Sequence, residues 1–374
     1  MLTDHNRMTA YHSSIMGNAA LFKGKTVVDV GSGSGILAAW CALAGARRVF
    51  AVEYTDMASN AKEVMKANGV DHIVTVVKGA IEDVALIDPE TGESVEGKVD
   101  IIVSEWMGYF LLRESMMDSL IRGRDRFLKP STGLMFPSHA TMYLAPISDE
   151  QEREHVSHEY SLSMSDWSSF VSSTKQTYGV DMQCLTANFE KETREYYILS
   201  SRWSELPVEA VVSDAVVVKE YDMMTCTVED SKGILSPVDF EFDIDPSQMH
   251  ESLKNPGQTP LLSGFAGWFT TDFKSRTDEV GRISAPPIEH PVCLSTGPEN
   301  GYTHWGQQSF FLPSPLPLVP GSTTKITGDL KMSRSKDNAR LYQCGIDFKA
   351  ERKDKASGKT LMEGEKVTIN YQMP

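Results

Sequence analysis

"VVDVGSGSGIL", residues 27–37, joins a β-branched run to a helical pattern through three glycines, and this stretch decides the fold. Gly31, Gly33 and Gly35 allow a tight turn and a close approach of the backbone to a ligand. The residues that follow, 35–46, carry apolar side chains at helical spacing. The stretch therefore predicts the first strand and the first helix of a βαβ unit.

Strand-like and helical runs alternate on either side of these glycines as far as residue 105. The strand-like runs are residues 25–30, 47–53, 73–79 and 99–105, and the helical runs are residues 35–46 and 57–69. The alternation predicts right-handed βαβ units and a parallel sheet. The strand-like runs are almost continuously apolar, which is typical of strands that are buried on both faces.

The pattern changes after about Pro137, where apolar and polar residues alternate with a period of two. This alternation predicts an antiparallel sheet or a barrel. Its strand-like runs are residues 140–147, 238–245, 267–275, 309–312, 325–332, 342–351 and 367–373. The Pro-rich residues 311–324 are expected to form a connector.

Residues 151–206 interrupt this pattern with a polar and aromatic segment that we expect to be helical. Its larger aromatic residues are Trp167, Tyr178, Tyr196, Tyr197 and Trp203. They form either a small core of the segment itself or a surface for another subunit, and the sequence leaves both interpretations open.

Bulk composition excludes several classes of protein. The chain has 374 residues, of which 41% are hydrophobic, and its net charge is −15. No apolar run reaches the roughly 18 residues that span a bilayer, and the N-terminus has no apolar signal core. The five cysteines form no CxxC pair, so we expect neither disulfides nor a metal site, in a reducing intracellular compartment. The charge argues against non-specific nucleic-acid binding; it suits basic partners or serves solubility alone.

The glycine spacing points to one cofactor. A dinucleotide site needs GxGxxG, but Ile36 occupies the position of the third glycine, which disfavours a pyrophosphate cradle. Asp29 at the end of the first strand can receive an ammonium group, directly or through water. Glu53 at the end of the second strand can accept both hydroxyls of a ribose. A ribose and an ammonium without a phosphate fit S-adenosylmethionine.

Two glutamates bracket an apolar run in "VSEWMGYFLLRES", residues 103–115. Glu105 ends the fourth strand and should face the ligand cleft. Glu114 lies nine residues further, so the two would point to opposite sides of one helix. If Gly108 permits a reversal they converge, and a guanidinium would satisfy both, walled by Trp106, Met107 and Tyr109. The alternative is that Glu114 pairs with a helix neighbour on the surface.

Four stretches together resemble the protein arginine N-methyltransferases of the type that makes asymmetric dimethylarginine. They are "VDVGSGSGIL", "SEWMGYFLLRESM", "RDRFLKPSTGLMFP" and "YTHWGQQSFFL". The likeness is greatest to the plant-type branch numbered ten, through "GYFLLRESM", "YGVDM", "THWGQQ" and "MSRSKDN". It implies a Rossmann-like class I methyltransferase domain at 1–137 and a β-barrel domain at 138–374. It also implies that about 151–206 is an inserted helical dimerisation arm, and that the protein is a homodimer in the cytoplasm and nucleus.

The resemblance also implies the roles of individual residues. Glu105 and Glu114 match the double-glutamate loop that holds the substrate guanidinium, and Asp4 pairs with His304 beside the substrate. The residues implied to contact the cofactor are Arg7, at its carboxylate, and Asp29, Gly31, Gly33, Gly35, Glu53, Ile81 and Glu82. The residues implied to shape the arginine pocket are Met1, Trp106, Met107, Tyr109, Met116 and Trp305. The implied substrates are histone tails and Gly/Arg-rich segments, with no direct nucleic-acid or membrane partner and no metal.

In the family, a helix with a Tyr-Phe-x-x-Tyr signature precedes the position of Met1 and folds over the cofactor, and the printed sequence starts after it. The sequence therefore does not determine how tightly the cofactor binds or how the active site closes over it. Either Glu114 or the Asp4–His304 pair could accept the proton that leaves the guanidinium. The alternatives to arginine methylation are a catalytically weak binding scaffold and a class I methyltransferase with another substrate.

Overall fold

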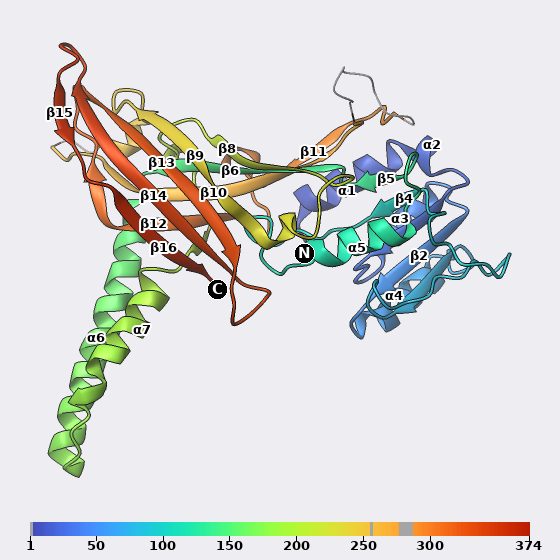
Figure 1. The fold of residues 1–374 in the computed structure, drawn as a ribbon, viewed down its shortest axis with the longest axis horizontal. Coiled ribbons are helices and arrows are strands. Elements are labelled where there is room, and N and C mark those ends of the chain that lie inside the picture. Colours follow the sequence, from blue (N-terminus) through green and yellow to red (C-terminus); the bar gives the residue numbers. More distant parts are fainter. Residues whose placement is uncertain (1–2, 255–256, 277–286) are drawn as a thin grey trace. The chain divides into compact units, whose positions relative to one another are not determined.

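A parallel sheet of five strands, in the order β3-β2-β1-β4-β5, forms the first part of the chain (Figure 1). Its strands are β1 (Thr26–Val30), β2 (Arg48–Glu53), β3 (Val74–Lys78), β4 (Ile101–Val103) and β5 (Leu134–Phe136). All residues of β1, β2 and β4 are buried, as expected for parallel strands that are covered on both faces. The predicted Rossmann-like fold is confirmed.

Three helices connect strands of this sheet: α3 (Ile36–Leu43), α4 (Met57–Ala67) and α5 (Met117–Phe127). Helices α1 (His5–Met16) and α2 (Ala19–Phe22) precede β1. The first predicted helix ends earlier than expected, at Leu43, because Gly45 adopts a φ of 93° that a right-handed helix does not allow. Helix α1 begins at the N-cap Asp4, whose carboxylate accepts a hydrogen bond from the main-chain N–H of Arg7.

Two further sheets have the strand orders β7-β12-β10-β6-β8, with β11 paired to β10, and β15-β14-β13-β9, with β16 paired to β14. The first sheet contains β6 (His139–Ile147), β7 (Arg202–Ser204), β8 (Val216–Asp222), β10 (Leu261–Phe273), β11 (Val292–Ser295) and β12 (Gln307–Pro317). The second contains β9 (Gly233–Ile244), β13 (Ser322–Arg334), β14 (Tyr342–Asp354), β15 (Thr360–Glu363) and β16 (Val367–Met373). The predicted β-barrel domain is confirmed as a barrel-like arrangement of antiparallel strands.

The helical segment between β6 and β7 consists of α6 (Glu150–Tyr178) and α7 (Thr186–Tyr197) (Figure 1). Trp167 on α6 stacks on Phe189 of α7 at 4.3 Å between ring centroids, and its indole N–H donates to Thr186. Leu162, Phe170 and Tyr178 remain exposed on α6 or at its end. The segment therefore has a small core of its own and also exposes apolar side chains.

The connector expected at 311–324 is wrong in its extent. Strand β12 continues to Pro317 and β13 begins at Ser322, so only four residues separate the two strands. The pairing of β12 with β7 ends at Ser309, before the first proline of this stretch. Prolines are tolerated in a strand whose edge needs no N–H donor, which is why the Pro-rich run can be a strand.

The structure is a computed structural model that describes residues 3–254, 257–276 and 287–374. Two compact units divide the chain. Unit 1 is Met1–Met142, Lys219–Lys232 and Phe269–Trp305, and unit 2 is Tyr143–Val218, Gly233–Trp268 and Gly306–Pro374. The predicted domain boundary between 137 and 138 stays a prediction. Among the described residues, no helix combines the length and the apolar composition that crossing a bilayer requires.

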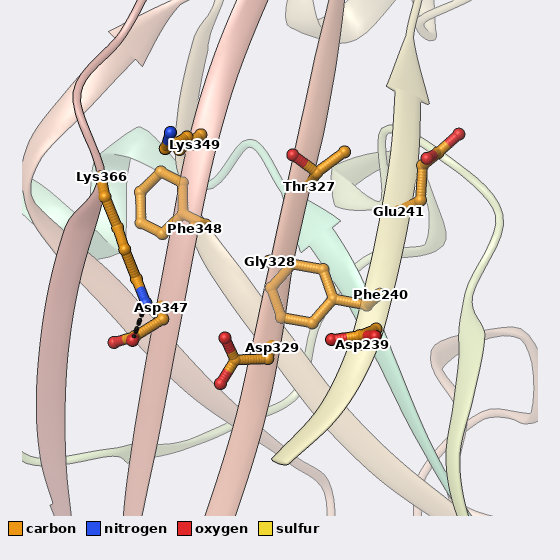
Figure 2. A pocket seen from close by; sticks show the side chains of 10 residues that line it. All are labelled: Asp239, Phe240, Glu241, Thr327, Gly328, Asp329, Asp347, Phe348, Lys349 and Lys366. Atoms are coloured by element: carbon orange, nitrogen blue, oxygen red, sulfur yellow. Dashed lines mark ion pairs between the residues drawn. The ribbon is translucent and has the colours of Figure 1, made fainter.

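A shallow hollow of about 440 Å³ lies on strands β9, β13 and β14 of unit 2 (Figure 2). Three aspartates, Asp239, Asp329 and Asp347, face one another across these strands in direct register. Lys366 forms an ion pair with Asp347. None of the residues predicted for the active site lines this hollow.

Candidate active site

The three glycines between β1 and α3 all adopt positive φ angles, of 72°, 53° and 83° for Gly31, Gly33 and Gly35. A side chain at Gly31 would also collide with Met116, whose terminal methyl group lies 2.1 Å from the position of a Cβ. At Gly33 the same position meets no atom within 4 Å. Of these three glycines, only Gly33 borders space that is open among the described residues, as the sequence predicts for a ligand cradle.

Asp29 is fully buried at the end of β1, and its carboxylate accepts a hydrogen bond from the main-chain N–H of Ala38 at 3.0 Å. This contact caps the first turn of α3. The second oxygen, Oδ1, has no hydrogen-bond partner among the residues described. Burial raises the pKa of Asp29 to about 7, against the opposing effect of the Ala38 hydrogen bond. Oδ2 of Asp29 is thus bonded to helix α3, and Oδ1 could accept a hydrogen bond from a ligand or a water molecule.

Glu53 ends β2 beside the glycine loop. Its Oε2 accepts from the main-chain N–H of Gly33 at 2.8 Å, and its Oε1 accepts from the N–H and the hydroxyl of Thr55 at 2.8 and 2.6 Å. A carboxylate offers about four acceptor directions, of which three are used here. One ribose hydroxyl can be accepted in this arrangement, and a second would require the Thr55 hydroxyl to turn away.

Ile81 and Glu82 follow β3 in a loop that α5 holds in place. Ile81 is buried, and Glu82 Oε1 accepts a hydrogen bond from the Ser119 hydroxyl at 2.7 Å. Arg126 donates to the main-chain carbonyl of Glu82 at 2.9 Å. The structure thus fixes the loop that the sequence assigns to the cofactor, and it places Asp29, Glu53 and the glycines in the same unit.

The run between the two glutamates reverses direction, which is one of the two alternatives that the sequence left open. Gly108 and Leu111 form a β-bridge, and the Gly108 N–H donates to the Leu111 carbonyl at 2.9 Å. Gly108 is required by close approach, since a Cβ there would lie 1.5 Å from the Arg113 carbonyl oxygen. Phe110, Leu111, Glu114 and Ser115 all have positive φ angles. Such strained backbone in non-glycine residues is typical of functional loops.

Glu105 is 9% exposed, and its Oε2 accepts a hydrogen bond from Arg7 Nε at 3.2 Å and forms an ion pair with Arg7 Nη2 at 3.1 Å. Burial raises the pKa of Glu105 to about 7; the Arg7 guanidinium opposes the rise, and the negative charge of Glu114 adds to it. Glu114, which is exposed, is therefore close enough to act on Glu105 electrostatically. The resemblance assigned Arg7 to the cofactor carboxylate, whereas in this structure it binds one of the two acids.

Asp4 and His304, 300 residues apart in the sequence, are joined by two hydrogen bonds. Asp4 Oδ2 lies 2.7 Å from His304 Nδ1 and accepts from the His304 main-chain N–H at 2.8 Å. Burial favours a higher pKa for Asp4, but the hydrogen bonds from Arg7 and His304 outweigh it and leave the pKa lowered. Burial lowers the pKa of His304, which Asp4 opposes only in part. An ionised Asp4 only accepts, so the proton belongs on Nδ1 and Nε2 carries a lone pair.

The remaining residues that the resemblance assigns to the arginine pocket differ in their exposure to solvent. Trp106, Met107 and Trp305 are buried, while Tyr109 and Met116 are half-buried. The indole nitrogen of Trp106 has no hydrogen-bond partner within the described ranges. Met1 lies outside the described residues.

The sequence analysis missed three residues that hold the predicted ones in place: Tyr11, Thr55 and Ser119. Tyr11 donates to the Ser104 carbonyl at 2.9 Å, directly before Glu105. A signal for it existed, since Asp4, Arg7 and Tyr11 have the i, i+3, i+7 spacing of one helix face. No comparable pattern marks Thr55 or Ser119.

Family models match both parts of this chain. Residues 138–353 match the family model of the arginine methyltransferase oligomerization subdomain, and residues 15–135 match that of the ribosomal protein L11 methyltransferase (PrmA). The protein arginine N-methyltransferases PRMT10 of Oryza sativa subsp. japonica and of Arabidopsis thaliana are each 43% identical to this chain. The alignments cover 96% of this chain and 86% and 84% of those relatives.

Two solved structures share the fold over the whole chain. The Arabidopsis thaliana protein arginine methyltransferase 10, described in a uniquely open conformation, has a TM-score of 0.84 at 39% identity. The Trypanosoma brucei PRMT1 enzyme–prozyme heterotetrameric complex with AdoHcy has a TM-score of 0.70 at 25% identity. Each match covers 100% of this chain and 96% of the other. With a family model over more than half of its length and such relatives, the chain belongs to the protein arginine N-methyltransferases.

Proposed function

We propose that this protein transfers methyl groups from S-adenosylmethionine to guanidino nitrogens of arginine in proteins, giving monomethylarginine and asymmetric dimethylarginine. The observation that carries the proposal is the reversal at Gly108, which returns Glu114 to the neighbourhood of Glu105. The negative charge of Glu114 raises the pKa of Glu105, and a cation between the two carboxylates would remove this repulsion. A guanidinium stays charged and offers donors in a planar fork, so it suits such a pair better than an ammonium.

The residues around the glycine loop fit S-adenosylmethionine. Among the described residues, no atom fills the space beside the Gly33 backbone and none pairs with Oδ1 of Asp29, while Glu53 keeps one acceptor direction for a ribose hydroxyl. The Glu82 side chain, oriented by Ser119, would contact the adenine amine. When bound, the cofactor supplies an electrophilic methyl group. A relative among the solved structures is a complex with AdoHcy, which supports this assignment.

The glutamates would bind and orient the guanidinium of the substrate. Glu105 is held on one side by Arg7, which leaves the substrate to approach from the side of Glu114. Two charge-assisted contacts would fix the plane of the guanidinium and draw its positive charge away from the attacking nitrogen. Trp106 and Met107, both buried, would exclude water from the contact and strengthen it.

The methylated nitrogen must lose a proton, and the structure offers two acceptors for it. His304 is neutral at pH 7, because its pKa is lowered, and its Nε2 carries the lone pair when Asp4 holds the proton on Nδ1. Glu114 is the second acceptor, and it is also needed for binding. We propose the His304–Asp4 pair as the acceptor, since Nε2 of the neutral imidazole has a lone pair for the proton and Glu114 is needed to bind the guanidinium.

Histone tails and Gly/Arg-rich segments are the proposed substrates, since the net charge of −15 suits basic partners. We further propose a homodimer in the cytoplasm and nucleus, formed through α6 and α7. The exposed Leu162, Phe170 and Tyr178 support this part of the proposal.

Mass spectrometry of a Gly/Arg-rich peptide incubated with the protein and labelled S-adenosylmethionine tests the proposed function. The expected products carry one methyl group and then two on the same terminal nitrogen. Label in RNA instead of peptide would indicate a methyltransferase with another substrate. Binding of S-adenosylhomocysteine without label in any substrate would indicate a scaffold, and either result would refute the proposal.

A further inference from the structure

The segment Ser104–Met107 carries Glu105, and its two end carbonyls accept hydrogen bonds from aromatic side chains. The Tyr11 hydroxyl donates to the Ser104 carbonyl at 2.9 Å, and the Trp305 indole N–H donates to the Met107 carbonyl at 2.9 Å. The Tyr11 hydroxyl also lies 3.6 Å from the sulfur of Met107. Both ends of the segment are thus held by groups from distant parts of the sequence.

Ser104 is fixed to the sheet by two further contacts. Its main-chain N–H donates to the Phe136 carbonyl at 3.0 Å, and its hydroxyl donates to the Val30 carbonyl at 2.8 Å. The Ser104 carbonyl is the group that leads into Glu105, and Tyr11 is the donor that fixes its direction. Tyr11 therefore fixes the direction of the backbone where the chain leaves the sheet and enters the turn between Glu105 and Glu114.

Helix α1 contacts both the backbone and the side chain at this point. Arg7 and Tyr11 are four residues apart, so they share one face of the helix. Arg7 binds the Glu105 carboxylate while Tyr11 binds the carbonyl that precedes it. One rigid element thus sets the origin and the orientation of the Glu105 side chain.

Tyr11 is itself held firmly. It is 1% exposed, and its ring packs edge-on against Phe273 with 5.0 Å between centroids. Burial raises the pKa of Tyr11 well above its ordinary value, and the negative charge of Glu105 adds to the rise. The hydroxyl therefore stays protonated and remains a hydrogen-bond donor, so only a mutation removes this donor. Its ring packing would survive the loss of the hydroxyl, which separates the two contributions.

We propose that Tyr11 is a positioning residue for methyl transfer, which orients Glu105 through the Ser104 carbonyl. The proposal rests on the proposed function. Loss of the hydroxyl would let the Ser104 carbonyl rotate and Glu105 shift against the substrate guanidinium. Small misplacements of groups that align reactants reduce the rate by one to two orders of magnitude, about 10- to 100-fold.

The test is Tyr11→Phe, with Tyr371→Phe as the matched control. Tyr371 is also fully buried and donates to a main-chain carbonyl, that of Phe311 at 2.9 Å, in unit 2. Both variants lose one buried hydroxyl and should lose similar thermal stability. We expect kcat on a saturating arginine peptide to fall about tenfold for Tyr11→Phe and to stay within about twofold for Tyr371→Phe. Affinity for S-adenosylhomocysteine should change in neither.

A rescue experiment separates positioning from packing. Incorporation of 4-aminophenylalanine at position 11 restores an N–H donor in place of the hydroxyl and should restore kcat to near the wild-type value. A Tyr11→Phe enzyme with unchanged kcat, or a rescue variant as slow as Tyr11→Phe, would overturn the proposal. If the wild-type protein methylates no arginine peptide, the proposed function fails instead, so the two failures are distinguishable.

Discussion

At the scale of single residues, burial, neighbouring charges and hydrogen bonds give the carboxyl groups of the site different pKa values. Glu105 and Asp29 are both buried and both have a pKa raised to about 7, yet Arg7 binds the first and a helix amide the second. Asp4 is equally buried but keeps a lowered pKa, because its hydrogen bonds outweigh desolvation. Hydrogen-bond partners, rather than residue type, therefore decide which carboxylate stays ionised.

Replacement of Glu114 by glutamine should abolish most of the activity while leaving the fold intact. The side chain is exposed, so the loss of its charge should change the unfolding temperature little, but the guanidinium loses one of its two anionic contacts. We expect kcat to fall by about 100-fold, the usual effect of removing one charge-stabilising group. Steady-state kinetics with saturating peptide measures this, and Glu363→Gln on the exposed edge of β15 serves as the control. Turnover within twofold of wild type in Glu114→Gln would rule out the paired-glutamate site.

Peptide affinity should depend on pH because a guanidinium needs Glu105 ionised. The pKa of Glu105 in the free protein is about 7, with Arg7, Glu114 and Asp4 as the charged groups that act on it. Below pH 7 the peptide must displace a proton, so its affinity should rise about fivefold between pH 6 and 7, rise about twofold more up to pH 8, and then level off.

Calorimetry with S-adenosylhomocysteine present, in two buffers of different ionisation enthalpy, measures both the affinity and the protons released. Asp29→Asn is the control, because it removes the other carboxyl that has a pKa of about 7. The pH dependence should persist in that variant. An affinity that stays constant between pH 6 and 8, or that loses its pH dependence in Asp29→Asn, would contradict the assignment to Glu105.

At the scale of secondary-structure elements, the periodic patterns predicted which side chains are buried, but they did not predict which charged residues lie opposite one another on neighbouring strands. Strands β9, β13 and β14 bring Asp239, Asp329 and Asp347 into one row, although each lies in an ordinary alternating pattern (Figure 2). Like charges directly opposite each other in a sheet are destabilising. Lys366 forms an ion pair with Asp347, which lowers the pKa of that carboxyl, and its positive charge also acts on Asp329. One lysine offsets only part of the repulsion among three aspartates.

Asp329→Asn should therefore stabilise unit 2. The central member of the row loses its charge while keeping its shape, and the expected gain in the free energy of unfolding is about 0.5 kcal/mol. Asp243→Asn is the matched control, since Asp243 faces Lys325 across the same pair of strands and should be neutral or slightly destabilising. Denaturant titration of both variants measures the difference. A loss of stability in Asp329→Asn would show that the aspartates have a favourable partner.

At the scale of the whole molecule, assembly depends on which aromatic residues of the helical segment pack internally. Trp167 and Phe189 stack on each other within the segment, and both are half-buried. Leu162 and Phe170 are 51% and 47% exposed, and two large apolar side chains so exposed on one helix are typical of an interface. The stacking of Trp167 on Phe189 confirms a small core within the segment, whereas a surface for another subunit stays a prediction.

The double variant Leu162→Glu/Phe170→Glu should convert a dimer to a monomer, because a buried carboxylate at an interface lacks compensation. Light scattering at micromolar concentration measures the molar mass. Val367→Glu, an exposed apolar position on β16, is the control and should remain dimeric. A monomeric wild-type protein, or a dimeric double variant, would remove α6 from the interface.

The sequence by itself determined the elements whose signal is local. Apolar strands that alternate with amphipathic helices could only be a parallel sheet, the glycine spacing excluded a dinucleotide cradle, and Gly108 made a reversal available to Glu114. Each of these inferences rests on residues within a few positions of one another, where backbone geometry dictates which side chains share a face. The Pro-rich run was misread for the same reason, since only the position of a strand in its sheet shows whether an N–H is needed.

The tertiary structure alone decided which distant groups meet. Arg7 reaches Glu105 over 98 residues, and Asp4 reaches His304 over 300. Periodicity reports that a side chain is buried, but not which partner compensates its charge, because that depends on how separate elements pack. Glu105 and Glu114 could be identified as candidates from the sequence, whereas only the folded structure shows that helix α1 holds Glu105 through Arg7.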